Sequence, residues 1–403
     1  MSDMRTHGVA MPYYRRVGEI PQKRHTQFRS PAGSLYAEEL MGVEGFSSDS
    51  ALLYHRFAPT AIVNAEVVPD HRGPLTPNHP LKPRHFRTQD LKWDAPADVD
   101  AVTGRRTLFG NNDITISFAI ATNPSPLYRN AAGDELIYVQ AGAARIETVY
   151  GALDVADGDY VVIPTSTTYR VLPSGEARLY IMEATGHIGP PRRYLSTKGQ
   201  FLEHAPYCER DIRGPSVPLL ADGEDVEVLV RHRAGLTRFT YANHPFDVVG
   251  WDGCLYPWVF NIRDFEPITG RVHQPPPVHQ TFEGPNFVVC SFCPRKVDYH
   301  PLSIPVPYNH ANVDSDELMF YVGGNYEARK GSGIGIGSLS LHPSGFTHGP
   351  QPGAAEASIG VDYFDETAVM VDTFRPLDLG EAAADCEDPR YAWSWAKRGP
   401  DWS

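Results

Sequence analysis

An all-β fold is predicted by three features of the sequence: its density of turn residues, its hydrophobic alternation and an internal repeat. The chain of 403 residues contains 35 glycines and 36 prolines, which favour many short strands joined by turns over long helices. Hydrophobic residues make up 41% of the chain, enough for a buried core and too many for a disordered protein. A chain of this length is expected to form two or three domains.

The charge balance argues against two classes of binding partner. The chain has 36 basic and 49 acidic side chains, and its formal net charge is −13. Nucleic acids and anionic membrane surfaces are bound through basic patches, so we expect neither as a partner. Residues 1–30 contain no apolar segment of the kind found in secretory signals, and the five cysteines are scattered as in reduced proteins. A cytoplasmic location is therefore expected.

Segments in which apolar and polar residues alternate with a period of two fall into two groups. Glycine and proline interrupt the alternation, as in antiparallel sandwiches and barrels. The first group comprises 114–122, 135–155, 159–173 and 177–183, and the second comprises 260–268, 287–295, 317–331, 337–349 and 357–365. Helix-compatible runs occur within 200–250 and 376–397, but neither is long. We therefore expect two β-rich regions with few short helices.

An internal repeat relates the two groups of strands. Residues 128–142 align without gaps with 310–324, and 163–169 align with 342–348 when their prolines are matched. Because the matches occur in the same order and at similar spacing, we interpret them as two tandem copies of one β-barrel unit. The predicted domains are an N-terminal β domain, 1–250, with its barrel at about 113–190, and a C-terminal domain, 251–403.

The aligned positions differ in the chemistry that their side chains can perform. The pairs are Tyr128 with His310, Glu135 with Glu317, and Tyr169 with His348. Two imidazoles and a carboxylate suit a metal ion, whereas two phenols in place of the imidazoles make a poor site. We therefore expect the second copy to be the active one and the first copy to be metal-free.

The set of His310, Glu317 and His348 has the composition of a known type of metal site. Two histidines and one carboxylate on one face of a barrel form the facial triad of non-haem Fe(II) oxygenases, which leaves positions open for substrate and O₂. The spacing alone fits solvated turn histidines equally well, so both interpretations stay open on that criterion.

The segment PYNHANVDSDELMFYVGGNYEARKGSGIGIGSLSLHPSGFTHGPQPG, residues 307–353, contains the pattern H-x-N-x(4)-E followed by H-P-x(4)-H-G-P. It resembles the metal-binding motifs of the homogentisate 1,2-dioxygenase family, which are cupin-type Fe(II) ring-cleaving dioxygenases. Residues 35–60 and 247–262 resemble further stretches of that family. The resemblance covers most of the chain and implies tandem cupin barrels of the jelly-roll type, with a degenerate first copy. The iron ligands that it implies are His310, Glu317 and His348.

The resemblance also implies roles for side chains around the metal. A catalytic histidine that deprotonates or holds a ring hydroxyl is expected, and the run VHQPPPVHQTF assigns that role to His273, with His279 as a second candidate. By the same resemblance, Tyr326 and His348 bind the substrate, and His342 orients a metal ligand from the outer sphere. Each of these side chains except His348 also has a structural interpretation: the two histidines before β-rich sequence as turn residues, Tyr326 as a strand residue and His342 as a core residue.

The resemblance implies cleavage of the homogentisate ring by O₂ to give maleylacetoacetate, in tyrosine and phenylalanine catabolism, with Fe(II) as cofactor. The expected partners are a small aromatic acid and O₂, and the resemblance suggests a homo-oligomer, either a trimer or a hexamer. The substrate carboxylate requires a local cation, because the net charge of the protein is negative. Arg56, Arg271, Arg295 and Lys296 are available, but the sequence assigns none of them.

Departures from the family's animal and fungal members leave the ring substrate open. The chain is shorter, Asn309 and Ala311 replace Tyr and Arg beside the first ligand, and the separation from His310 to Glu317 is one residue longer. The chain therefore looks like a short bacterial branch, for which gentisate or hydroquinone is an alternative substrate. Alternatives outside ring cleavage are a cupin binding protein, disfavoured by the open metal positions, and a sugar-phosphate isomerase, disfavoured by Asn312 at its second histidine position.

Overall fold

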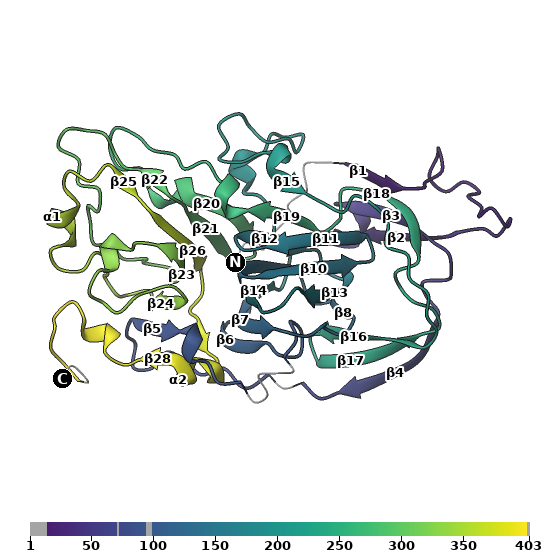
Figure 1. Ribbon diagram of the computed structural model, residues 1–403, viewed down its shortest axis with the longest axis horizontal. Helices are drawn as coiled ribbons and strands as arrows, with labels where there is room; N and C mark the ends of the chain where they lie inside the picture. The colour runs from purple at the N-terminus through teal and green to yellow at the C-terminus, as the bar shows by residue number, and fades with distance from the viewer. Residues whose placement is uncertain (1–13, 71, 94–98, 401–403) are drawn as a thin grey trace. The chain divides into compact units, whose positions relative to one another are not determined.

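The computed structural model describes residues 14–70, 72–93 and 99–400 and shows a mostly β protein (Figure 1). Strands β1 to β28 carry the fold, and the α-helices of the described residues are two short ones, α1 (Ala354–Ser358) and α2 (Glu381–Cys386). The prediction of an all-β fold with few short helices is therefore confirmed. No helix in these ranges is long and apolar enough to cross a membrane.

The chain groups into two compact units. The first comprises residues 1–72, 95–106 and 117–261, and the second comprises 73–94, 107–116 and 262–403. Two segments from the first third of the chain thus belong to the second unit. The predicted boundary at residue 250 stays a prediction, because spatial grouping does not show which part folds alone.

A four-stranded antiparallel sheet of the first unit positions a buried histidine. Its strands, in spatial order, are β1 (Arg15–Gly18), β18 (Val248–Gly253), β3 (Ser50–His55) and β2 (Ala37–Gly42). The imidazole of His55 lies between two carboxylates, with Nδ1 2.6 Å from Asp247 and Nε2 2.9 Å from Glu39.

The first barrel consists of two sets of strands that enclose a shared core. One set, in spatial order, is β11 (Gly151–Ala156), β10 (Ala143–Thr148), β13 (Thr168–Pro173), β8 (Tyr128–Asn130), β16 (Val226–His232), β17 (Gly235–Tyr241) and β4 (Ile62–Val68). The other set is β15 (Ile212–Arg213), β19 (Trp258–Asn261), β12 (Asp159–Ile163), β9 (Glu135–Ala141), β14 (Ala177–Ala184) and β7 (Ile114–Ala121). Buried side chains of both sets, such as Ile137, Ile146 and Val171, pack in one cluster.

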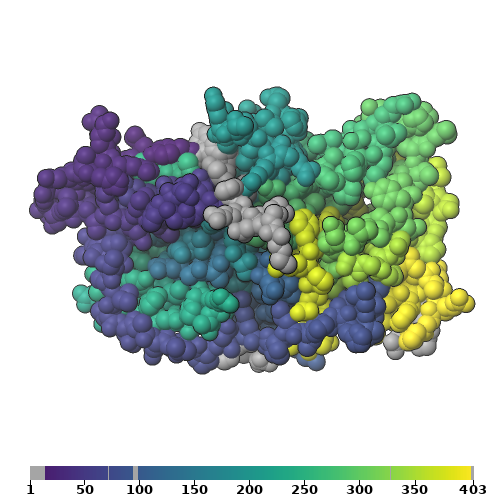
Figure 2. Space-filling model, turned by 180° about the vertical axis from the view of Figure 1, so that it is seen from behind, coloured from purple at the N-terminus to yellow at the C-terminus, as the bar shows by residue number. Residues whose placement is uncertain are grey.

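The segment 200–250 corrects one expectation. No α-helix forms there; β16 and β17 instead pair as an antiparallel hairpin, and β17 also pairs with β4, which lies at the exposed edge of the sheet (Figure 2). The hairpin forms because neighbouring strands satisfy its backbone hydrogen bonds, a long-range effect that local composition does not reveal. The run within 376–397 does contain the helix α2.

The second unit is built on one sheet of seven strands. In spatial order these are β20 (Gln280–Gly284), β21 (Phe287–Phe292), β26 (Glu366–Thr373), β23 (Asp316–Gly324), β24 (Ser338–His342), β5 (Arg84–Arg87) and β28 (Glu387–Asp388). A smaller pair is β22 (Arg295–Lys296) with β25 (Tyr363–Phe364). Strand β6 (Arg106–Gly110) pairs with β27 (Asp378–Leu379), and both belong to the sheet that contains β7. Strand β5 enters from far upstream and pairs with β24, which carries His342.

Strand register supports the predicted repeat. In the first unit Tyr128 pairs with Tyr169, and in the second His310 pairs with His348 as an isolated bridge. The partners of the two glutamates correspond as well: Glu135 pairs with Ile163 and Glu183, and Glu317 pairs with His342 and Asp372. The register thus agrees with the alignment of Ile163 with His342 and adds one further pair of equivalent positions, Glu183 and Asp372.

The aspartate before each glutamate makes equivalent hydrogen bonds in the two copies. The Asp134 carboxylate accepts hydrogen bonds from the backbone N–H groups of Thr165 and Ile188, and the Asp316 carboxylate accepts them from Ser344 and Leu377. Each aspartate thus holds the two loops that follow the strands on either side of its own. In the second copy, one of these is the loop that leads from β24 to His348.

A guanidinium fills the centre of the first barrel. Arg105 Nη1 lies 2.6 Å from Glu135 Oε1 and 3.0 Å from Glu183 Oε1, and Nη2 lies 2.8 Å from the Tyr169 hydroxyl. Tyr169 in turn donates to Glu135. Arg105 immediately precedes β6, and in the second copy His279 immediately precedes the corresponding strand, β20.

Candidate metal centre

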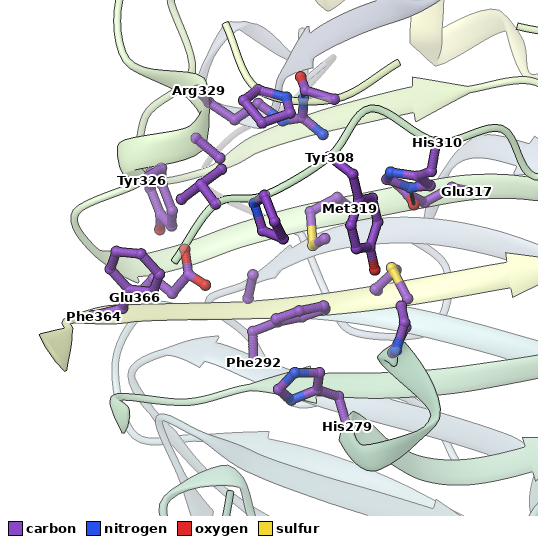
Figure 3. Close-up of a pocket in the computed structure, with 18 of the residues that line it drawn as sticks. His279, Phe292, Tyr308, His310, Glu317, Met319, Tyr326, Arg329, Phe364 and Glu366 are labelled. Carbon is purple, nitrogen blue, oxygen red and sulfur yellow. Dashed lines mark hydrogen bonds and ion pairs between the residues drawn. The ribbon is translucent and has the colours of Figure 1, made fainter. Parts of the chain in front are cut away.

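The structure brings together the three side chains that the sequence selects as metal ligands. One ligand atom from each of His310, Glu317 and His348 lies within 4.8 Å of the others. The backbones of the two histidines exchange hydrogen bonds of 2.7 and 2.8 Å, and Glu317 is the second residue of β23. Figure 3 shows His310 and Glu317 side by side at the cavity. Two backbone segments, the bridge and the strand, therefore hold the donors in place.

The donor distances suit a divalent metal ion. His310 Nε2 lies 3.3 Å from Glu317 Oε2, and His348 Nε2 lies 3.2 Å from Glu317 Oε1. Two ligands at about 2.1 Å from a metal and at right angles to each other are separated by about 3 Å. Although burial opposes ionisation, hydrogen bonds from the three surrounding histidines hold the pKa of Glu317 well below its ordinary value. The carboxylate is therefore in the ionised form that a metal requires.

His342 is placed behind the carboxylate. Its Nδ1 lies 2.9 Å from Glu317 Oε1, and its Nε2 lies 2.8 Å from the hydroxyl of Tyr391. Burial lowers the pKa of His342 to about 3, so the imidazole is neutral and carries one N–H. If Nδ1 donates to Glu317, Nε2 accepts the Tyr391 O–H, and both groups are satisfied. This geometry orients Glu317, and Tyr391 is a partner that the sequence analysis missed.

A cavity of about 240 Å³ opens beside the three ligand candidates. Its apolar wall includes Phe292 on β21, Met319 on β23 and Met370 on β26. Side chains of this kind offer flat, adaptable surfaces for a ring. The size and the lining suit a small aromatic molecule held beside the metal position.

His273 lies at the cavity but is paired with other side chains. Its Nε2 is 3.2 Å from the Tyr308 hydroxyl, and its Nδ1 is 3.5 Å from Asp298 Oδ2. The Tyr308 ring lies between two imidazoles, with its centroid 5.2 Å from that of His273 and 5.7 Å from that of His310. Tyr308, which was not selected from the sequence, thus lies between His273 and the ligand candidate His310.

His279 is the more buried of the two candidate histidines. It ends the 3₁₀ turn Pro276–His279, stacks on Phe292 at 4.4 Å and lines the same cavity. Its Nδ1 is buried without a hydrogen-bond partner in the part of the chain that the structure describes. Burial lowers the pKa of His279 to about 3, with a smaller contribution from the Arg295 charge, so the ring is neutral.

Tyr326 follows β23 instead of lying within it. The strand ends at Gly324, whose φ of +79° is a left-handed conformation that favours glycine. The chain then turns, and Tyr326 lines the cavity beside Tyr321, with ring centroids 4.7 Å apart. Its hydroxyl donates to the Thr367 carbonyl at 3.4 Å, and its lone pairs remain for a ligand.

Charged side chains also reach the cavity. Of the four cations considered from the sequence, Arg295 lines it, in an ion pair of 2.7 Å with Glu366. Arg329 and Asp372 line it as well, and neither was selected from the sequence. Burial and the nearby Glu317 charge raise the pKa of Asp372 well above its ordinary value. The sequence did offer a reason to select Arg329, because it lies three residues after Tyr326, which the sequence selects as a substrate-binding residue.

Two family models match the chain and together cover most of it. The N-terminal model of homogentisate 1,2-dioxygenase matches residues 8–262, and the C-terminal model matches residues 274–398. The three ligand candidates lie within the second match.

Individual relatives show the same likeness. A protein described as a "putative dioxygenase" from Saccharolobus solfataricus is 38% identical over 390 residues, which is 96% of this chain and 99% of that protein. The homogentisate 1,2-dioxygenase of Emericella nidulans is 29% identical, covering 86% of this chain and 81% of that protein. That of Rhodopseudomonas palustris is 27% identical, with coverage of 94% and 90%. Among solved structures, a cupin 2 conserved barrel protein of Leptotrichia buccalis matches 72% of this chain and 96% of its own, at 10% identity and a TM-score of 0.33.

Proposed function

The chain belongs to the homogentisate 1,2-dioxygenase family and is a dioxygenase of that family, and we propose that it cleaves the ring of homogentisate with O₂ to give maleylacetoacetate. The observation that carries this proposal is the set of His310, Glu317 and His348 beside a cavity of single-ring size. We further propose that the reaction serves tyrosine and phenylalanine catabolism, in a cytoplasmic homo-oligomer.

Family membership implies a metal cofactor, and we propose that it is Fe(II). Two imidazoles and one carboxylate are the donor set of non-haem Fe(II) oxygenases. Held by His310, Glu317 and His348, iron would supply the redox chemistry that joins a ring substrate to O₂. Glu317 would be held in its binding orientation by the hydrogen bond from His342, which the Tyr391 hydroxyl fixes from behind.

His273 is the better of the two candidates for the general base. Asp298 on its Nδ1 side favours a tautomer in which Nε2 can accept a proton. That nitrogen contacts the Tyr308 hydroxyl, so we propose that a ring hydroxyl passes its proton to His273 directly or through Tyr308. His279 is a weak base because its pKa is near 3; we propose that it holds the ring by stacking and by its unpartnered Nδ1.

The remaining cavity residues would position the ring and exclude water. Phe292 and Met319 supply apolar walls, and we propose that the Tyr326 hydroxyl accepts a hydrogen bond from a substrate O–H. A ring held between these walls would meet the metal position with one hydroxyl, as proximity requires. The same arrangement would accept gentisate or hydroquinone, which are the alternative substrates.

Product mass tests the proposal. Protein loaded anaerobically with Fe(II) is mixed with homogentisate and air-saturated buffer, and the molecular mass of the product is measured by mass spectrometry. We expect a ring-opened product heavier than homogentisate by one O₂, absent in His348→Ala and present in the matched first-barrel variant Tyr169→Phe. An unaltered mass with homogentisate but a gain with gentisate or hydroquinone would reassign the substrate. No product from any ring, despite bound iron, would favour a binding protein.

A further inference from the structure

Arg329 is a buried cation at the substrate cavity. It ends the 3₁₀ turn Glu327–Arg329, and only 8% of the residue is exposed. Its Nε donates to the Tyr321 hydroxyl at 3.2 Å, and its Nη1 donates to the Gly349 carbonyl oxygen. Figure 3 shows Arg329 and His310 at the same cavity. Gly349 directly follows the ligand candidate His348, so a molecule beside the metal position could also meet Arg329.

No carboxylate of the described residues forms an ion pair with Arg329, although the charge of Glu317 acts on its guanidinium from a greater distance. Both of its hydrogen-bond acceptors are neutral oxygens, and Nη2 makes no hydrogen bond to a described residue. A guanidinium does not deprotonate in proteins, so its charge persists on burial. A buried charge is expected to have a compensating partner. Arg295 differs, because its charge is met by Glu366 at 2.7 Å.

The charge balance of the cavity points to an anionic occupant. The charged side chains that line it are Arg295, Arg329, Glu317, Glu366 and Asp372. A divalent metal on the ligand set would add two positive charges. The four positive charges would then exceed the two or three negative charges, whichever protonation state Asp372 adopts, and an anion would restore the balance.

We propose that Arg329 binds the carboxylate of the substrate and thereby sets the preference of this enzyme for ring acids over uncharged rings. The proposal rests on the proposed ring-cleavage function and extends it to the recognition of the acid group. The planar guanidinium presents donors in a fork that matches a carboxylate. Arg329 is thus a specificity residue, distinct from the groups that handle the proton and the metal.

Binding measured without turnover tests the proposal. The probes are homogentisate and its primary amide, 2,5-dihydroxyphenylacetamide, which has nearly the same shape but no charge. Dissociation constants are measured under argon by calorimetry, on protein loaded with Co(II). For the wild type we expect the acid to bind more tightly than the amide. For Arg329→Gln we expect the acid to bind ~30-fold or more weakly, because an interaction with a buried charge is lost, while the amide changes less than ~3-fold.

Two controls separate recognition from a structural role. Arg295→Gln removes a paired cation of the same cavity and should leave the acid-to-amide ratio unchanged. The Co(II) visible spectrum of Arg329→Gln should match that of the wild type, because the ligands are intact. Equal weakening of acid and amide would overturn the proposal and show that Arg329 only supports the turn at Gly349. Equal binding of the two probes by the wild type would overturn it while leaving ring cleavage intact. Binding of neither probe would reject homogentisate itself.

Discussion

Glu135 and Glu317 occupy the same position in the two copies of the repeat, yet Glu135 meets the guanidinium of Arg105 whereas Glu317 meets three imidazoles. The neighbouring positions follow the same contrast, with a Tyr128–Tyr169 pair in one copy and a His310–His348 pair in the other. An internal cation thus compensates the buried carboxylate in the first copy. In the second copy, a bound metal ion would compensate the charge of the buried Glu317 carboxylate.

Loss of Arg105 should destabilise the first unit. In Arg105→Met the carboxylates of Glu135 and Glu183 would remain buried without this cation. We expect the free energy of unfolding to fall by about 3–5 kcal/mol, as when one partner of a buried ion pair is removed. Urea unfolding followed by fluorescence measures the change.

The matched control is Arg145→Met, which removes an exposed partner of Asp154. This change should cost less than about 1 kcal/mol. Similar losses in the two variants would show that the Arg105 cluster contributes no more than a surface pair.

His342 and Tyr391 should affect metal affinity without binding the metal. We expect His342→Asn to weaken metal binding by ~10–100-fold, because Glu317 loses the group that orients it. Tyr391→Phe should weaken it less, since the imidazole stays in place. Competition titration with a coloured chelator measures both affinities. An unchanged affinity in His342→Asn would show that the protein backbone alone positions Glu317.

The two candidate histidines should respond differently to substitution. His273→Ala removes the proposed base, so we expect kcat to fall by ~10²-fold or more. His279→Ala should mainly weaken substrate binding, because a neutral ring with a pKa near 3 is a poor proton acceptor. Steady-state oxygen consumption gives both parameters for each variant. A larger loss of kcat in His279→Ala would transfer the base role to His279.

The buried His55 should make stability depend on pH. Burial opposes its charge, but hydrogen bonds to Asp247 and Glu39 raise the pKa of His55 to about 9. A raised pKa stabilises the fold fully below the unfolded value of about 6.5 and loses that effect as the pH rises through about 9. The stability advantage of wild type over His55→Gln should therefore shrink between pH 6 and pH 10, by about 3 kcal/mol. Urea unfolding of both proteins at pH 6 and pH 10 measures this difference in the free energy of unfolding. A difference that grows with pH would contradict the prediction.

The sequence predicts the three candidate ligands that the structure brings together because they belong to local, repeated patterns. His310 and Glu317 are seven residues apart, and the same separation relates Tyr128 to Glu135, so alignment of the copies exposes the difference in chemistry. Strand alternation likewise predicts most of the strands in both units.

The partners that the sequence does not reveal come from distant segments. Arg105 lies 30 residues before Glu135, and Tyr391 lies 49 residues after His342. Neither contact has a local periodicity, because it depends on how strands pair across the sheets. Tyr308 is a different case: it is close to His310 in sequence, but a tyrosine in a proline-rich loop resembles an ordinary surface residue until its contact with His273 is known.

Oxygen uptake by protein loaded anaerobically with Fe(II) tests the central claim most directly. We predict that homogentisate and O₂ are consumed in equal amounts, that His310→Ala abolishes the uptake, and that Tyr128→Phe, the matched change in the first copy, preserves it. Uptake that persists in His310→Ala would contradict the assignment of this metal centre, and no uptake with homogentisate by the iron-loaded wild type would contradict the proposed reaction.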